Sequence, residues 1–382
     1  MTNSRTESPD LQRPFSSIGE VAWNGLCDST GPFVDWRFLA SAEEAGCTGA
    51  DTGWRPCPLT EARDDGSLIC AAPAWFKDHS HGEFVFDFAW AQASGRAGMP
   101  WYPKLLVAAP FSPVTGPRLL GSADHPSAAL DLVRRMETLV GELGLWSAGV
   151  NFCDADDADI LREAGWLERF DWQYHWRNDG YRDFDEFLSR LRRKPRKNIR
   201  AERRRVHEQG WRFRWRHGAS LDECELDLVD RCYQTTFAVY GNLPSLNRDF
   251  FEKAAARFGR EFLVCIAERD GEDLACAVFW RDAKRLYGRY WGSLVETRDV
   301  HFETCYYQGI DYCIREGIEW FEPGAQGEHK IRRGFLPRPT RSFHYIRHPG
   351  LREGVSRWLA AEGEFLEERS KRLAELDPFR TG

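Results

Sequence analysis

The order in which short apolar strands and amphipathic helices follow one another is the feature that most restricts the fold of this chain. Apolar runs of about four to eight residues predict strands, and apolar residues at helical spacing predict helices. The first series predicts strands at 84–90, 103–110, 147–152 and 170–176, with helices at 126–143 and 154–165. Such a series is typical of an α/β (α+β) fold in which helices flank a mixed sheet.

A second series of the same kind follows Asn178. It predicts helices at 184–209, 221–240 and 301–316, and strands at 211–216, 262–268, 274–281, 285–291, 318–322 and 342–347. Because 382 residues exceed what one hydrophobic core usually organises, the recurring order predicts two domains. We expect a flexible tail at 1–14, domains at 15–180 and 181–350, and a charged C-terminal helix at 351–382.

The bulk composition narrows the class of protein. Eleven cysteines without a C-x-x-C pair predict reduced thiols and therefore a cytoplasmic protein. No apolar segment has the length of a signal peptide or a membrane span. The formal charge of -7 means that any attraction to phosphates must come from a local patch of positive charge. The sequence gives no indication of an oligomeric state.

The segment from Phe321 to Phe335 is the strongest candidate for a site, because it places acid, amide, imidazole and ammonium groups between glycines. In it, His329 can accept a proton and Lys330 can stabilise developing negative charge, with Glu328 beside them. A histidine that only orients a backbone carbonyl is the alternative for this position. Further polar groups in the same half of the chain join the candidate site, namely Arg289, Tyr290, Glu303, Tyr307 and Gln326.

A basic run between Arg190 and Arg205 is the one strong concentration of positive charge in this acidic chain. Arginine side chains bind phosphate oxygens in pairs, so a phosphate-bearing ligand or an RNA backbone would be attracted. Arg196, Lys197 and Arg200 are the members we expect to face a ligand. A solvated helix face with no ligand is the alternative.

A second anion site is predicted between a strand and a helix in the first half of the chain. The spacing Arg-x-x-Gly-x-Ala, given by Arg118, Gly121 and Ala123, places backbone N–H groups at the helix start. An ordinary loop is the alternative. His79 and His81 lack further ligands at suitable spacing, so we expect no metal site.

Several longer segments resemble the FemAB-like family of bacterial proteins, which are described as predicted N-acyltransferases of the GNAT superfamily. The segments that carry the resemblance are 102–106, 110–120, 173–176, 286–292, 301–310 and 324–335. The resemblance implies two tandem GNAT-like domains. It also implies transfer of an acyl group to an amine, as in the Fem-type enzymes, which use aminoacyl-tRNA and a peptidoglycan precursor.

The resemblance extends to individual positions. The segment 194–200 is similar to the basic helix of the Fem-type enzymes, and 330–335 is loosely similar to their Phe-Lys-x-Gly-Phe segment. The loop at Arg118, Gly121 and Ala123 resembles the pyrophosphate loop with which GNAT enzymes bind coenzyme A. No inserted coiled-coil arm is evident between 205 and 262, so acetyl-coenzyme A and aminoacyl-tRNA both stand as acyl donors. No tightly bound cofactor is expected.

These assignments give a mechanism as a hypothesis. Glu328 or His329 would act as the base, Lys330 would stabilise the oxyanion or a phosphate, and Tyr290 would protonate the leaving group. The amine, on a small molecule or a peptide such as a peptidoglycan precursor, would be positioned by Glu303 and Gln326. A non-catalytic protein that binds a peptidoglycan fragment or RNA through the basic helix and aromatic clusters is the alternative.

Overall fold

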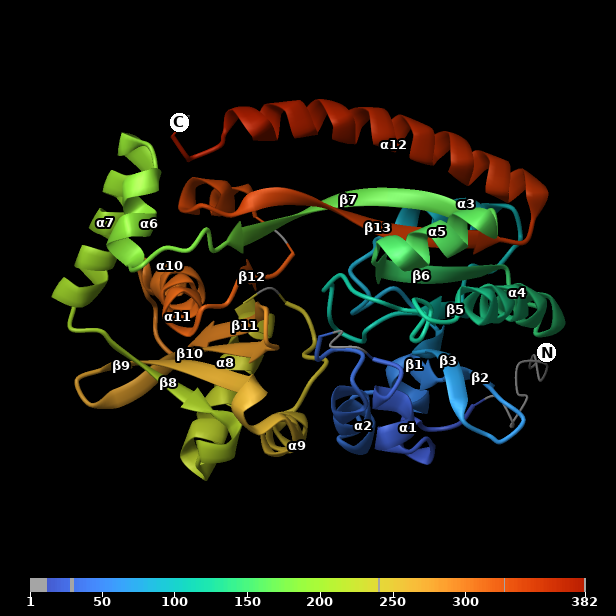
Figure 1. The fold of residues 1–382 in the computed structure, drawn as a ribbon, viewed down its shortest axis with the longest axis horizontal. Helices are drawn as coiled ribbons and strands as arrows, with labels where there is room; N and C mark the ends of the chain where they lie inside the picture. Colours follow the sequence, from blue (N-terminus) through green and yellow to red (C-terminus); the bar gives the residue numbers. More distant parts are fainter. Residues whose placement is uncertain (1–11, 28–30, 240, 326, 381–382) are drawn as a thin grey trace. The chain divides into compact units, whose positions relative to one another are not determined.

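The computed structural model of the chain describes residues 12–27, 31–239, 241–325 and 327–380. Its residues group into two compact units, one formed by 1–171 with 339–369 and the other by 172–338 with 370–382. Two of the boundaries fall inside strands and one falls inside the last helix. Each unit is a mixed sheet flanked by helices, which is the architecture expected from the alternating elements (Figure 1).

The first unit is built around a sheet with the strand order β1-β4-β5-β6-β13 and a separate hairpin, β2-β3. Its strands are β1 (Trp54–Pro56), β2 (Leu59–Ala62), β3 (Leu68–Ala72), β4 (Ala74–Lys77), β5 (Lys104–Val107) and β6 (Ser147–Cys153), with most of β13 (Leu336–Ile346). Its helices are α1 (Glu20–Asn24), α2 (Trp36–Glu44), α3 (Phe88–Arg96), α4 (Pro126–Glu142), α5 (Ala155–Glu163) and most of α12 (Pro349–Glu375). Single helical turns lie at η1 (Phe15–Ser17) and η2 (Ala50–Thr52).

The central helices of this unit begin where the sequence predicts. Pro126 occupies the first turn of α4, and Asp154 caps α5 by accepting a hydrogen bond from the backbone N–H of Asp157. Leu132, Val133 and Met136 of α4 are fully buried against β5 and β6. Burial of this apolar stripe provides the main stabilisation of the helix.

The second unit has the strand order β7-β12-β11-β10-β9-β8. Its strands are β8 (Arg212–His217), β9 (Phe262–Arg269), β10 (Glu272–Arg281), β11 (Arg285–Ser293) and β12 (Trp320–Glu322), with the end of β7 (Leu167–Arg177). Its helices are α6 (Phe184–Arg190), α7 (Arg193–Glu208), α8 (Glu223–Val239), α9 (Arg248–Phe258), α10 (Val300–Phe302) and α11 (Gln308–Glu316). Short helical segments lie at η3 (Gly218–Ser220), η4 (Gly259–Glu261), η5 (Glu303–Tyr307) and η6 (Glu328–Arg333).

The structure confirms most of the predicted elements and corrects one. Residues 84–90 were expected to form a strand, but α3 begins at Phe88, and Asp87, just before it, binds the side chains of Trp101, Tyr102 and Lys104. The observed units also differ from the expected domain limits. Strand β13 pairs with β6 along residues 341–346, so 339–350 group with the first unit, whereas 172–180 group with the second. No helix among the described residues is long and apolar enough to cross a membrane.

Candidate functional site

The strands β11 and β12 separate in the middle of the second unit. They pair in parallel only from Arg285 to Tyr287, and the last pair joins Tyr287 to Glu322. The next residue, Pro323, has no N–H to continue the ladder. On its other side β11 carries a bulge, because Val278 of β10 pairs with Tyr290 while the following residue pairs with Gly288. Bulges of this kind redirect side chains beside sites.

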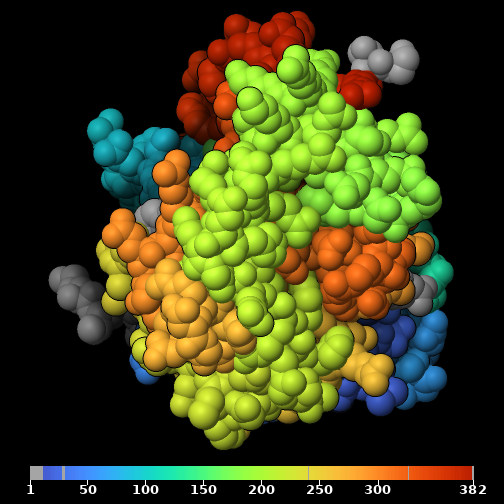
Figure 2. Space-filling model, turned by 90° about the vertical axis from the view of Figure 1, so that its left-hand side faces the viewer, coloured from blue at the N-terminus to red at the C-terminus, as the bar shows by residue number. Residues whose placement is uncertain are grey.

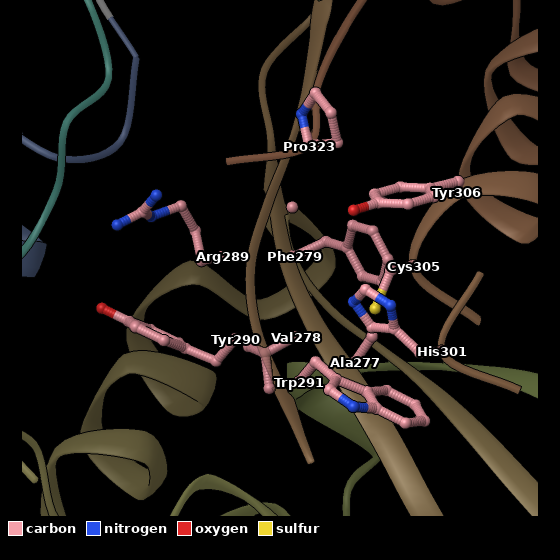
Figure 3. Close-up of a pocket in the computed structure, with 11 residues that line it drawn as sticks. Ala277, Val278, Phe279, Arg289, Tyr290, Trp291, His301, Cys305, Tyr306 and Pro323 are labelled. Carbon is pink, nitrogen blue, oxygen red and sulfur yellow. The ribbon is translucent and has the colours of Figure 1, made fainter. Parts of the chain in front are cut away.

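A cavity of about 100 Å³ lies where the strands separate. Figure 3 shows residues from β10, β11, the α10–α11 segment and Pro323 around it. The lining residues are Ala277, Val278, Phe279, Gly288, Arg289, Tyr290, Trp291, His301, Cys305, Tyr306 and Pro323. Most of these are apolar or aromatic, and a few polar groups are set among them, as in small-molecule sites.

A π-helical turn, η5, interrupts the helix that faces the cavity. Cys305 and Tyr306 belong to this turn, and both line the cavity. The Tyr306 hydroxyl lies 3.1 Å from Nε2 of His329, and the Tyr306 ring packs 5.4 Å from the ring of His301. Turns of the π type occur often at functional sites, because they shift side chains away from regular helical positions.

Lys330 is buried beside this cavity. Its ammonium group donates to the carbonyl of Gly324 at 2.7 Å, and a Cβ placed on Gly324 would lie 4.0 Å from Nζ and 3.7 Å from the carbonyl oxygen of Gly288. Burial lowers the pKa of Lys330 to about 7, and the positive charge of Arg289 acts in the same direction. At neutral pH this amine can therefore either carry a proton or accept one.

Two imidazoles near the cavity stay neutral at neutral pH. Burial, together with the neighbouring His329, Lys330 and Arg333, lowers the pKa of His301 to about 4. The pKa of His329 is also lowered, first by partial desolvation of its ring, one side of which lies near Phe302 and Tyr306 although the residue is exposed, and then by Arg333 and Lys330. A neutral imidazole can accept a hydrogen bond or a proton, so His329 is suited to exchange a proton with the Tyr306 hydroxyl.

Glu303 does not face the cavity. Its carboxylate is completely buried, pairs with Arg203 of α7 at 3.0 Å and accepts a hydrogen bond from Gln308 at 2.9 Å. The Tyr307 hydroxyl likewise bonds to Glu202 of α7. These contacts use the polar atoms of both predicted site residues to fix η5 against α7.

Arg333 completes this attachment. Its guanidinium donates to the Tyr307 hydroxyl at 2.9 Å, forms an ion pair with Glu202 at 2.9 Å and lies 3.6 Å from the ring centre of Phe302. Breaking one member of such a buried network leaves the other charges without compensation. The network therefore holds the π turn, and with it Tyr306, in place.

Only some of the other predicted site residues lie at the cavity. The side chains of Glu328 and His329 are exposed, and only Lys330 of this triplet is buried. Arg289 and Tyr290 line the cavity, but Figure 3 shows both side chains on the opposite side of β11 from Tyr306. Gln326 lies outside the described residues.

Three titratable lining residues were absent from the prediction, namely His301, Cys305 and Tyr306. The segment 301–310, to which they belong, is among those that carry the family resemblance. Regular helical spacing cannot reveal a π turn, so the direction of Tyr306 could not be derived from the sequence.

The basic helix predicted from the sequence is α6 with α7, and in Figure 2 its yellow-green residues lie at the surface of the second unit, next to the orange residues of 301–316. Arg203 and Arg205 point inward and form ion pairs with Glu303 and Asp299. Of the three predicted ligand-facing residues, Arg200 pairs with Asp185 at 3.2 Å on the surface. Arg196 and Lys197 form no ion pair with any described residue.

The loop at Arg118 has a structural role in the first unit. The Arg118 guanidinium is buried and donates only to backbone carbonyls, including that of Asn151 at 2.9 Å. The backbone N–H groups of Arg118 and Leu119 donate to the Asp157 carboxylate, so the donors expected to bind pyrophosphate are used within the unit.

The two small residues of this loop, Gly121 and Ala123, differ in their surroundings. A Cβ on Gly121 would lie 2.3 Å from the carbonyl oxygen of Ile69, so this glycine permits close packing. Ala123 is exposed.

Comparison with known proteins agrees with this architecture. The FemAB-like family model, described as peptidoglycan biosynthesis/recognition, matches residues 14–381. The fold is similar to the C-terminal domain of a putative lysylphosphatidylglycerol synthetase from Agrobacterium fabrum, with a TM-score of 0.55 and 10% identity over 89% of this chain and 95% of that one. It is also similar to FemX, with a TM-score of 0.54 and 12% identity over 89% of this chain and 98% of that one. No curated protein matches.

Proposed function

Because the chain belongs to the FemAB-like family of peptidoglycan biosynthesis and recognition proteins, we propose that it is an N-acyltransferase. It would transfer an acyl group from a thioester or ester donor to an amine. The observation that carries the proposal is the gathering of Lys330 and the Tyr306–His329 pair around the cavity where β11 and β12 separate. These groups supply charge stabilisation and proton transfer, the two needs of aminolysis.

The first step forms the bond between the amine nitrogen and the acyl carbon. The carbonyl oxygen of the acyl group gains negative charge in this step. The Lys330 ammonium, which lies at the Gly324 carbonyl beside the cavity, would stabilise that charge.

The second step breaks the bond between the acyl carbon and the leaving sulfur or oxygen. The leaving atom needs a proton, which the Tyr306 hydroxyl can supply while His329 restores it. The proton lost by the attacking amine goes to solvent or to His329, so the amide and the protonated leaving group are the only products. Tyr306 thus takes the role that the sequence suggested for Tyr290.

The acceptor amine in this proposal belongs to a peptidoglycan precursor or to another small molecule or peptide. Such a precursor carries phosphate, and so do both donor types, coenzyme A thioesters and aminoacyl-tRNA. On α7, Lys197 is exposed and Arg196 is partly buried, and both side chains could bind such a phosphate. The fold likeness to FemX is consistent with an aminoacyl donor, and the cavity with a smaller one.

Incubation of the full chain with acyl thioesters or with aminoacyl-tRNA, together with a panel of amines, tests the proposal. A gain in amine mass equal to the acyl group, measured by mass spectrometry, is the expected result. The gain should be lost in Lys330→Met and kept in Arg332→Met, since Arg332 is exposed in the same turn. Binding of a peptidoglycan fragment or RNA without turnover for any donor would instead support a non-catalytic binding protein.

A further inference from the structure

The lining of the cavity restricts the acyl group that it can hold. No Asp or Glu occurs among its eleven lining residues. His301 is kept neutral by burial and by neighbouring positive charges, and burial keeps Cys305 protonated by raising the pKa of its thiol. The positively charged groups nearest to this space are Arg289 and Lys330.

The nearby carboxylates do not line the cavity, and each has at least one oxygen in an ion pair. Glu303 pairs with Arg203 at 3.0 Å, and Glu322 pairs with Arg285 at 2.7 Å. An ammonium group placed in the cavity would therefore lose its water, meet positive charge and find no lining carboxylate. Burying an unpaired charge in this way is strongly unfavourable.

The size of the cavity adds a second restriction. A cavity of about 150 Å³ lined by apolar side chains holds one benzene molecule, so the present volume of about 100 Å³ fits a chain of about four or five heavy atoms. The walls that set this limit are Phe279, Trp291 and Tyr306 (Figure 3).

We propose that this cavity takes a short, uncharged acyl chain and excludes an aminoacyl group, whose α-ammonium it cannot pair. The inference rests on the proposed function and specifies its donor. It separates two donor classes that family membership leaves open, because an aminoacyl ester always carries the α-ammonium and a simple acyl thioester does not. In the transfer itself, the thioester C–S bond breaks, the C–N bond forms, and the sulfur leaves as a thiol.

A matched pair of donors tests the charge restriction. The propionyl and glycyl thioesters of N-acetylcysteamine have the same shape, and differ in a methyl group against an ammonium group. After correction for their uncatalysed reaction with the same amine, kcat/KM should favour propionyl at least hundredfold. The octanoyl thioester, which exceeds the cavity, should be used at least tenfold less well than propionyl.

A binding measurement makes the test independent of turnover. Propionamide should shift the ring Cε1–H resonance of His301 in the NMR spectrum of the full chain, assigned with His301→Gln, and glycinamide should not at tenfold higher concentration. Gly288→Ala should weaken propionamide binding at least fivefold, because its Cβ would lie 3.3 Å from Phe279 and Phe321. Gly354→Ala, whose Cβ has no neighbour within 4 Å, is the control.

The outcomes separate this inference from the proposed function. If no donor reacts but propionamide alone shifts His301, the cavity assignment stands and the transferase proposal fails. Equal use of glycyl and propionyl donors would overturn the inference and would point to Glu322, whose Oε2 is buried and makes no hydrogen bond with any described residue. Failure of both amides to shift His301 would overturn it as well.

Discussion

The Tyr306 hydroxyl lies 3.1 Å from Nε2 of His329, although the two residues come from different elements, the π turn η5 and the short 3-10 helix η6. This contact joins an exposed imidazole to a tyrosine that lines the cavity. Proton transfer can thus reach the cavity from solvent through two side chains. The following predictions examine this pair and the groups that hold it.

Tyr306→Phe removes the hydroxyl and retains the ring. We expect kcat for acyl transfer to fall by about 10² to 10⁴, the usual contribution of a positioned acid or base. The free energy of unfolding, measured with urea, should change by less than about 1.5 kcal/mol, since one hydrogen bond is lost. The control is Tyr312→Phe in α11, which removes a hydroxyl that accepts a hydrogen bond from Arg281 of β10. This substitution should leave kcat nearly unchanged.

The low pKa of Lys330 should appear in the pH dependence of stability. Its pKa is about 7 in the folded chain and near 10.5 when unfolded, so between these values the unfolded state binds more protons. The contribution of Lys330 to the free energy of unfolding therefore rises with pH from about 7 to 10.5, by up to about 1.4 kcal/mol per pH unit. Subtracting the urea unfolding curves of Lys330→Met from those of the wild type isolates this slope. A pH-independent difference would show that Lys330 titrates normally.

Glu303→Gln should destabilise the chain rather than alter substrate binding alone. The substitution leaves Arg203 without its buried partner, and the expected loss is about 3 kcal/mol in the free energy of unfolding. The exposed Glu328→Gln is the control, and should change stability by less than about 0.5 kcal/mol. A stable Glu303→Gln variant with a raised KM for the amine would contradict this interpretation. It would show that Glu303 positions the amine, as the sequence suggested.

Arg118→Met tests whether the loop of the first unit is structural. The substitution leaves several backbone carbonyls without their donor, so we expect a loss of more than about 3 kcal/mol in the free energy of unfolding. Arg96→Met, on an exposed position, should have little effect. A folded and stable variant with a raised KM for a coenzyme A thioester would instead identify the loop as a donor site.

The exposed end of α7 is expected to bind phosphate. Replacing both Arg196 and Lys197 by Gln should weaken pyrophosphate binding about tenfold in calorimetry and make the remaining binding less sensitive to salt. Arg204→Gln, which removes a charge paired with Glu208 on the same helix, should leave binding unchanged. Equal loss in all these variants would indicate a general charge effect.

Much of the fold follows from sequence patterns, because helix starts and buried strands depend on local signals. The Pro126 start, the Asp154 cap and the strands from Phe262 to Ser293 are examples. The strand predicted at 84–90 was wrong, because part of this apolar run belongs to α3. The start of α3 depends on tertiary contacts of Asp87, which a local pattern does not reveal.

The sequence indicated segments that contribute residues to the cavity, but not the arrangement of their side chains. The segments 289–292, 301–309 and 321–335 all contribute to it, yet which side chains face the cavity depends on a bulge and a π turn. Neither has a sequence period of its own. The ion pair between Arg203 and Glu303 is equally hidden, since it joins residues a hundred positions apart.

The central claim is that acyl transfer takes place at the cavity beside Lys330. Single-turnover transfer of a propionyl group from its thioester to an amine, followed by mass spectrometry, tests it most directly in the wild type, Lys330→Met and Arg332→Met. We predict a rate at least hundredfold lower in Lys330→Met, with the wild-type rate in Arg332→Met and unfolding curves that keep their cooperativity. Equal rates in all three proteins would contradict the claim.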